Sequence, residues 1–133
     1  MTEVSAMLDA DYEAIRVERS GDGVITVVID RPEARNALNS TVRTELADVM
    51  PAIEESDARV AVLTGSSDCN AFVAGADVSE LQERGMLEQR RASQRPRIYE
   101  TIAELQTPVV ARINGHALGG GLELATACDI RIA

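Results

Sequence analysis

The sequence contains no lysine and no tryptophan, and all 13 of its basic residues are arginine. Aromatic residues are scarce, with only Tyr12, Phe72 and Tyr99 in 133 positions. The chain therefore lacks the aromatic platforms on which single-stranded bases stack. Its 22 acidic residues give a net charge of -9, which opposes the phosphates of nucleic acids and of anionic membranes. Neither nucleic acid nor membrane is expected as a partner.

Cysteine is also rare, and long apolar runs are missing. Cys69 and Cys128 show no C-x-x-C or metal-ligand spacing, so they are predicted to be free thiols in a reducing compartment, with no metal site. No apolar segment approaches the ~18 residues that a membrane span needs. Residues 1–13 lack the basic and apolar regions of a signal peptide. We expect a cytoplasmic protein with a flexible leader at 1–13 and one domain over 14–133.

The excess of acid without lysine has two explanations. High salt screens the self-repulsion of such a chain, because the Debye length falls to about 3 Å at 1 M. A halophilic source would therefore tolerate this charge, whereas a GC-rich genome would also replace lysine by arginine. The sequence favours neither explanation over the other.

Hydrophobic periodicity indicates alternating strands and helices. Residues 15–19 and 24–29 flank a Ser-Gly-Asp-Gly turn and predict a β-hairpin. Asn39 or Ser40 is expected to cap a helix, in which Pro51 predicts a kink or an early end. A short buried strand is expected at 60–63. One apolar helix face follows the cap, comprising Val42, Leu46, Val49 and Ile53. This order of elements predicts an α/β fold.

The segment 83–106 is strongly charged. Residues 88–95 have no apolar face, so this part is predicted to be either a mobile lid or a solvated helix on the surface. Ile98, Ile102 and Leu105 do share a face, which predicts a helix that ends before Thr107-Pro108.

A glycine-rich turn near the end of the chain is the strongest candidate for a site. The apolar run 109–113 predicts a strand, Asn114-Gly115 breaks it, and Gly119–Gly121 precede an apolar helix that carries Glu123. Free amides and the helix dipole at such a turn favour a negative ligand atom. Taken alone, three glycines before a helix also fit a tight turn without function. The spacing does not match the G-x-G-x-x-G pattern of dinucleotide-binding folds.

A second stretch favours the functional reading of the turn. Val60-Ala-Val-Leu-Thr-Gly65 is followed by Ala71-Phe-Val-Ala-Gly-Ala-Asp77, and Arg31-Pro-Glu-Ala-Arg-Asn-Ala-Leu38 precedes both. Together with Asn114-Gly-His-Ala-Leu-Gly-Gly-Gly-Leu-Glu-Leu-Ala125, these motifs resemble the enoyl-CoA hydratase/isomerase (crotonase) family, in the same order. The resemblance runs from about Ile15 to Ala133. It implies a spiral of ββα units, truncated before the C-terminal helical region, so the sequence would correspond to the N-terminal half of the family's chain.

The resemblance also implies roles for individual residues. The backbone amides of Ala76 and Gly120 would form an oxyanion hole, which is commonly the largest single contribution to such catalysis. Glu123 would be one of two carboxylates that act on water and on the substrate's Cα. The second carboxylate is expected beyond Ala133.

Binding of the coenzyme A part of the substrate is implied at Ala74, Asp77, Val78, Ser79 and Arg35. Many relatives have lysine where this chain has Asn70 and Ser79, which puts affinity for the CoA phosphates in doubt. No separate cofactor is expected, because coenzyme A belongs to the substrate. Asp77 has an alternative role as a helix cap, and His116 and Asp129 are expected to be structural.

The function implied is that of an enoyl-CoA hydratase, a lyase that adds water to a 2-enoyl-CoA thioester. Glu123 favours water chemistry, because isomerases of the family often lack an acid there. An enoyl-CoA isomerase or another acyl-CoA enzyme of the family is the first alternative, and a truncated, non-catalytic acyl-CoA-binding or assembly subunit is the second. Full-length members of the family are usually homotrimers or dimers of trimers.

Overall fold

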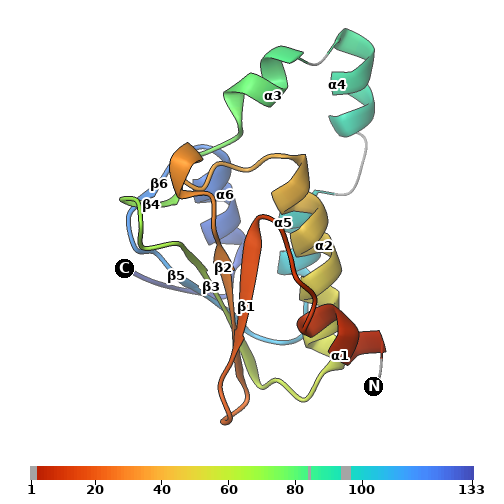
Figure 1. Cartoon of the computed structure of the whole chain (residues 1–133), viewed down its shortest axis with the longest axis vertical. Coiled ribbons are helices and arrows are strands. Elements are labelled where there is room, and N and C mark those ends of the chain that lie inside the picture. The colour runs from red at the N-terminus through yellow and green to blue at the C-terminus, as the bar shows by residue number, and fades with distance from the viewer. Residues whose placement is uncertain (1–2, 84, 94–96) are drawn as a thin grey trace.

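The computed structural model describes residues 3–83, 85–93 and 97–133. A mixed five-stranded sheet runs through the molecule in the order β1-β2-β3-β5-β7, and β4 and β6 form a separate small sheet (Figure 1). The strands are β1 (Ile15–Arg19), β2 (Val24–Ile29), β3 (Val60–Gly65), β4 (Ala71–Val73), β5 (Val109–Arg112), β6 (His116–Ala117) and β7 (Ile130–Ile132). The helices are α1 (Glu3–Leu8), the short 3-10 helix η1 (Pro32–Ala34), α2 (Ser40–Glu55), α3 (Val78–Glu83), α4 (Met86–Ser93), α5 (Ile98–Ala103) and α6 (Gly120–Ala127). The predicted α/β class is confirmed.

The hairpin starts the sheet, and the later strands add to it in parallel. β1 pairs antiparallel with β2, with Ile15 opposite Ile29. β2, β3, β5 and β7 are mutually parallel, so their carboxyl ends lie at one edge of the sheet. The loops that leave β3 and β5 at this edge lead to β4 and β6, which pair with each other. The topology thereby brings the two glycine-containing stretches together.

Helix α2 provides the main cover of the sheet. Asn39 caps it, because its Oδ1 accepts a hydrogen bond of 2.9 Å from Val42 N. The four residues of the predicted apolar face are completely buried: Val42, Leu46, Val49 and Ile53. The predicted early end at Pro51 is wrong, since the helix continues to Glu55. Pro51 is exposed, so the carbonyl that loses its amide partner on this side can be hydrated.

Residues 1–13 were expected to be a flexible leader, but Glu3–Leu8 forms helix α1. Helix α1 packs on α2, and Leu8 is only 2% exposed. The Tyr12 hydroxyl donates a hydrogen bond of 2.6 Å to Met7 O, and Arg19 pairs with Asp9. Burial of an apolar side chain against α2 stabilises a helix that is too short to be stable alone.

Helices α3 and α4 extend away from the rest of the molecule (Figure 1). The described side chains of α4 are exposed, with Met86 at 91% and Leu87 at 60%. This agrees with the surface-helix alternative for residues 88–95, of which positions 94 and 95 lie outside the described residues. The helix predicted from Ile98 is confirmed as α5, and Ile98 and Ile102 are buried.

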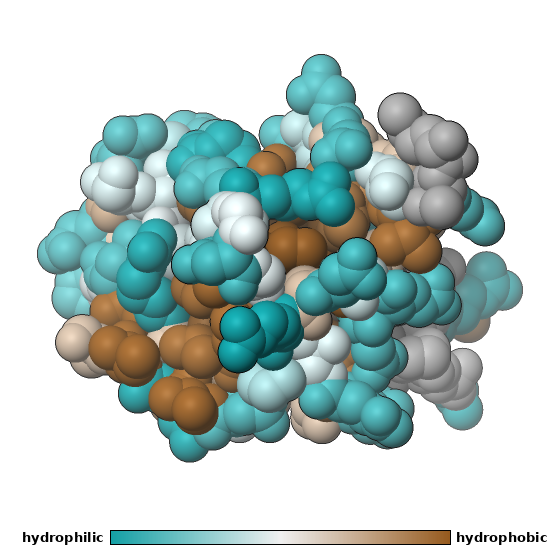
Figure 2. All heavy atoms as spheres, turned by 90° about the horizontal axis from the view of Figure 1, so that it is seen from below, coloured by the Kyte–Doolittle hydropathy of each residue, from teal (hydrophilic) through white to brown (hydrophobic). Residues whose placement is uncertain are grey.

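Hydrophobic side chains also reach the surface. On the face seen from below they gather in patches between hydrophilic ones (Figure 2). Four large apolar side chains near the end of the chain are more than half exposed, namely Leu118, Leu122, Ile130 and Ile132. Two of them belong to β7, an edge strand of the sheet. In the described part of the chain, no helix has the length and hydropathy that crossing a membrane requires.

Candidate active site

The loop after β4 fixes the direction of one backbone amide. Leu38 N donates to Gly75 O at 2.8 Å, and Asp77 N donates to Leu38 O at 2.9 Å. A trans peptide is planar, so its N–H points opposite to its C=O. Because the Gly75 carbonyl faces Leu38, the N–H of Ala76 faces the other way. This N–H donates no hydrogen bond to any described residue.

Gly75 makes this orientation possible. Its φ of +127° is a conformation that side chains with a Cβ rarely adopt. A Cβ here would also approach Leu118 O to 3.3 Å. Gly75 therefore allows the backbone conformation that orients the Ala76 N–H.

A second free amide lies at the beginning of α6. Gly119, with φ 52° and ψ -118°, precedes the helix, and Gly120 is its first residue. The first amides of a helix have no partner within it, and the Gly120 N–H has none elsewhere among the residues described. The dipole of the helix adds a positive partial charge at this end.

The two amides lie close together. A Cβ placed on Gly120 would stand 3.7 Å from Ala76 N and 3.5 Å from Leu38 Cδ1. The start of α6 reaches this position because Gly121 packs directly on β4, where a Cβ would lie 1.9 Å from Val73 O. The structure therefore brings Ala76 and Gly120, the residues predicted for an oxyanion hole, into one small space.

Glu123 is one helical turn from Gly120. Its backbone N–H donates to Gly119 O at 3.0 Å, and its side chain is exposed. Within residues 3–83, 85–93 and 97–133, nothing donates a hydrogen bond to its carboxylate. The carboxylate of Glu123 is therefore exposed and unpaired among the described residues, on the first turns of the helix that begins at Gly120.

Asp77, predicted to contact substrate, uses its side chain within the protein. Its Oδ1 accepts hydrogen bonds from the hydroxyl and from the backbone N–H of Ser79, so it caps the first turn of α3. Its Oδ2 pairs with Arg31 Nη2 at 3.1 Å. The hydrogen bond from Ser79 and the Arg31 guanidinium hold the pKa of Asp77 below its ordinary value. The side chain of Asp77 therefore acts as a helix cap, which is the alternative role expected for it from the sequence.

The remaining predicted binding residues surround this loop. Ala74 N donates to Arg35 O at 3.2 Å, which places Arg35 beside the loop with an exposed side chain. Val78 is 62% exposed, and Ser79 is exposed as well. Arg35, Ala74, Val78 and Ser79 thus lie at an accessible edge next to Ala76.

Two residues that shape this region, Asn36 and Tyr99, were not recognised from the sequence. Asn36 is fully buried and in a left-handed conformation; its Oδ1 accepts from Arg31 N, and its Nδ2 donates to Ala71 O. Asparagine tolerates this conformation better than most residues, so its presence in the motif could have indicated a left-handed backbone here. Tyr99, whose hydroxyl would lie 2.9 Å from a Cβ on Gly120, gave no signal beyond the rarity of aromatics.

Asp129 is structural, as predicted, because its Oδ2 accepts a hydrogen bond of 2.8 Å from Val109 N. His116 lies in β6 opposite Ala71. Among the described residues, no three His, Cys, Asp or Glu side chains come together as metal ligands.

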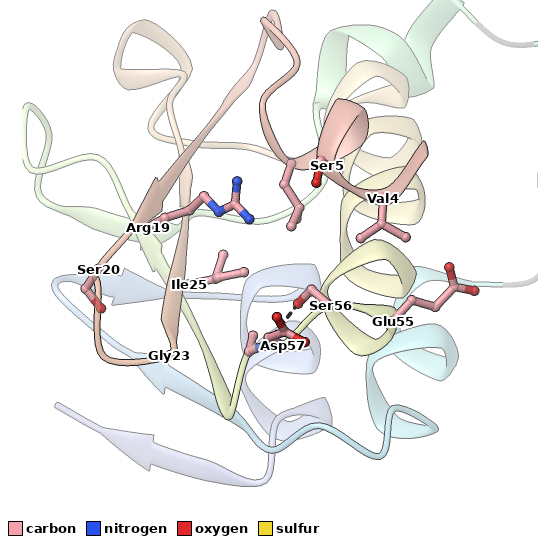
Figure 3. Close-up of a pocket in the computed structure, with 11 residues that line it drawn as sticks. Val4, Ser5, Arg19, Ser20, Gly23, Ile25, Glu55, Ser56 and Asp57 are labelled. Atoms are coloured by element: carbon pink, nitrogen blue, oxygen red, sulfur yellow. Dashed lines mark hydrogen bonds between the residues drawn. The ribbon is translucent and has the colours of Figure 1, made fainter. Parts of the chain in front are cut away.

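A hollow of about 480 Å³ opens elsewhere, between α1, the β1–β2 turn and the end of α2 (Figure 3). It lies at the amino ends of β2 and β3, whereas the site described above follows the carboxyl end of β3. Two of its polar side chains already have partners: Arg19 pairs with Asp9, and the Ser56 hydroxyl donates to Ile53 O and accepts from Ala58 N. It contains neither of the free amides.

Comparison with known proteins shows the family of the chain. The profile of the family described as enoyl-CoA hydratase/isomerase matches residues 19–133. The chain is 43% identical to the short-chain-enoyl-CoA hydratase of Clostridium acetobutylicum, over 88% of this chain and 45% of that protein. It is 39% identical to the crotonyl-CoA hydratase of Syntrophomonas wolfei, over 92% of this chain and 47% of that protein.

Solved structures show the same fold. The enoyl-CoA hydratase from Bacillus anthracis superposes with a TM-score of 0.82 at 35% identity, covering 91% of this chain and 47% of that one. The enoyl-CoA hydratase from Thermoplasma volcanium gives 0.77 at 34%, covering 99% and 50%. The chain belongs to the enoyl-CoA hydratase/isomerase family and has its crotonase-like fold. It spans about half the length of the curated relatives it matches.

Proposed function

We propose that the protein is an enoyl-CoA hydratase-like lyase, which adds water across the 2,3 double bond of a 2-enoyl-CoA thioester. The observation that carries this proposal is the pair of free amides, Ala76 N–H and Gly120 N–H, which meet beside a helix N-terminus. Two fixed donors of this kind suit an oxygen on which negative charge grows during reaction. Membership of a family that includes crotonyl-CoA hydratase supports the choice of thioester.

The chemistry assigned to the site is conjugate addition. The oxygen of water bonds to C3 of the enoyl group, the double-bond electrons move toward the carbonyl, and an enolate forms whose oxygen lies between the two amides. C2 then takes a proton from one of the carboxyl groups of the site, which restores the carbonyl and gives the 3-hydroxyacyl-CoA. Glu123 would hold the attacking water and accept its proton, and a second carboxylate beyond Ala133 would complete the set.

The coenzyme A part is assigned to the accessible edge beside the amides. Backbone groups of residues 74 and 76–79 would contact it, and the exposed guanidinium of Arg35 would face its phosphates, since arginine binds phosphate bidentately. The Asp77 side chain is not assigned to the ligand, because it caps α3 and pairs with Arg31.

Hydration of crotonyl-CoA by the full-length protein tests the proposal, through the loss of the enoyl-thioester absorbance. Glu123→Gln should lower kcat by about 10²–10⁴-fold, which is the usual contribution of general acid–base catalysis. It should leave CoA binding unchanged. Glu104→Gln, at another exposed glutamate, is the matched control and should retain full turnover. A wild-type protein that binds but does not hydrate crotonyl-CoA would contradict the proposal.

An enoyl-CoA isomerase is the second candidate. The observation in its favour is 40% identity over 121 residues to a protein described as an enoyl-CoA isomerase/hydratase from Mycosarcoma maydis. The same amide pair would hold the enolate of either reaction. Turnover of a 3-enoyl-CoA faster than a 2-enoyl-CoA would favour isomerisation.

A further inference from the structure

Tyr99 stands beside the two free amides on a different helix. It is the second residue of α5, which packs against α6, and its half-buried ring contacts the hydrophobic core. The hydroxyl would lie 2.9 Å from a Cβ on Gly120, and Ala76 N would lie 3.7 Å from the same point. Three potential donors therefore surround one small space.

The Tyr99 hydroxyl has no hydrogen-bond partner among the described residues. Every fully buried side-chain nitrogen or oxygen in that part of the chain does have a partner. The hydroxyl is therefore not sealed in the closed core, and it lies next to Gly120.

A phenol in this position has consequences for a bound thioester. It offers one O–H donor, and its ring is held by α5 and the core, so the donor is placed before the ligand arrives. A preorganised donor near growing negative charge stabilises the transition state more than the ground state. We propose that the Tyr99 hydroxyl donates a third hydrogen bond to the thioester oxygen, beside the amides of Ala76 and Gly120. This role rests on the proposed function.

The experiment compares the only two tyrosines of this chain in the full-length protein. Tyr99→Phe removes only the hydroxyl and keeps the packed ring. Tyr12→Phe is the matched control, because it removes a hydroxyl that donates to Met7 O and takes no part in the site. For crotonyl-CoA hydration, Tyr99→Phe should lower kcat about 10-fold or more, as expected for a lost hydrogen bond to a charged group. KM should change less than about 3-fold, and Tyr12→Phe should match the wild type within about 2-fold.

A second readout separates contact with the substrate from a structural effect. Butyryl-CoA is saturated and is not hydrated, so it reports on the bound thioester alone. Its carbonyl stretch, isolated by ¹³C labelling at C1, should fall on binding to the wild type and to Tyr12→Phe. The shift should be clearly smaller with Tyr99→Phe.

The outcomes distinguish the two proposals. Wild-type turnover together with an unchanged kcat or an unchanged carbonyl shift in Tyr99→Phe overturns the role of Tyr99 and leaves the hydratase function standing. A wild-type protein without turnover overturns the hydratase function, and the role of Tyr99 with it.

Discussion

Substituting alanine for Gly121 sets two effects of opposite sign against each other. Within a helix, alanine is favoured over glycine by about 0.5–1 kcal/mol, because glycine loses more backbone entropy on folding. Propensity alone therefore predicts a more stable protein. The contact with β4 predicts the reverse, since a Cβ at this position would lie 1.9 Å from Val73 O and 2.7 Å from Val73 C.

The steric clash with Val73 should outweigh the gain in helix propensity. An ordinary contact begins at 3.4 Å, and the atom in the way is backbone, which cannot rotate aside. Overpacking of this kind costs about 1–3 kcal/mol. The hydrogen bond from Leu118 N to Val73 O, 3.2 Å long, would be strained as well, at a cost of about 1 kcal/mol. After subtracting the gain in propensity, we expect a net loss of about 2 kcal/mol.

Urea unfolding followed by circular dichroism measures this difference. Gly21→Ala is the matched control, since a Cβ there meets nothing within 4 Å, and its stability should change by less than about 1 kcal/mol. Turnover of Gly121→Ala should also fall, because any shift of α6 moves the Gly120 amide. A Gly121→Ala protein as stable as the wild type would refute the close packing of α6 on β4.

Three further predictions concern charge and reactivity. Arg31→Met should cost about 1–3 kcal/mol in urea unfolding, because the pair that Arg31 forms with Asp77 is mostly buried, at 16% and 14% exposed. Arg16→Met, which breaks an exposed ion pair, should cost at most about 1 kcal/mol. Equal losses of stability in the two variants would contradict the larger contribution assigned to the Arg31–Asp77 pair. The lowered pKa of Asp77 means that the folded state binds fewer protons. Its contribution to stability should be complete above about pH 4 and should be lost as the pH falls through the lowered pKa. Asp77→Asn should remove the contribution of Asp77 to the pH dependence of the unfolding free energy in acid. An unchanged pH dependence in this variant would contradict the lowered pKa of Asp77. Burial raises the pKa of Cys128 to about 12, so iodoacetamide near neutral pH should label Cys69 first and Cys128 only after unfolding.

Much of the fold follows from local patterns in the sequence. The apolar spacing of α2, its Asn39 cap and the hairpin turn are each set by neighbouring residues, so they could be predicted. Pro51 misled the prediction because tertiary packing of the buried face outweighs one missing hydrogen bond. Helix α1 was missed because its stability comes from burial of Leu8 against α2, which no local pattern reveals.

The site was predictable only in part. The assignment of Ala76 and Gly120 came from the resemblance of whole motifs, since spacing alone cannot show that two distant loops meet. The pairing of Arg31 with Asp77 and the position of Tyr99 depend on contacts between segments far apart in the sequence. The cytoplasmic location, the assembly as a homotrimer or dimer of trimers and the absence of a separate cofactor stay predictions.

A structure of the full-length protein bound to acetoacetyl-CoA, whose enolate form resembles the charged intermediate, would show whether the two amides hold the thioester oxygen. We expect this oxygen to lie about 2.7–3.1 Å from both Ala76 N and Gly120 N, with the Glu123 carboxylate facing the acyl chain. A thioester oxygen bound away from this pair of amides would rule out the proposed oxyanion hole.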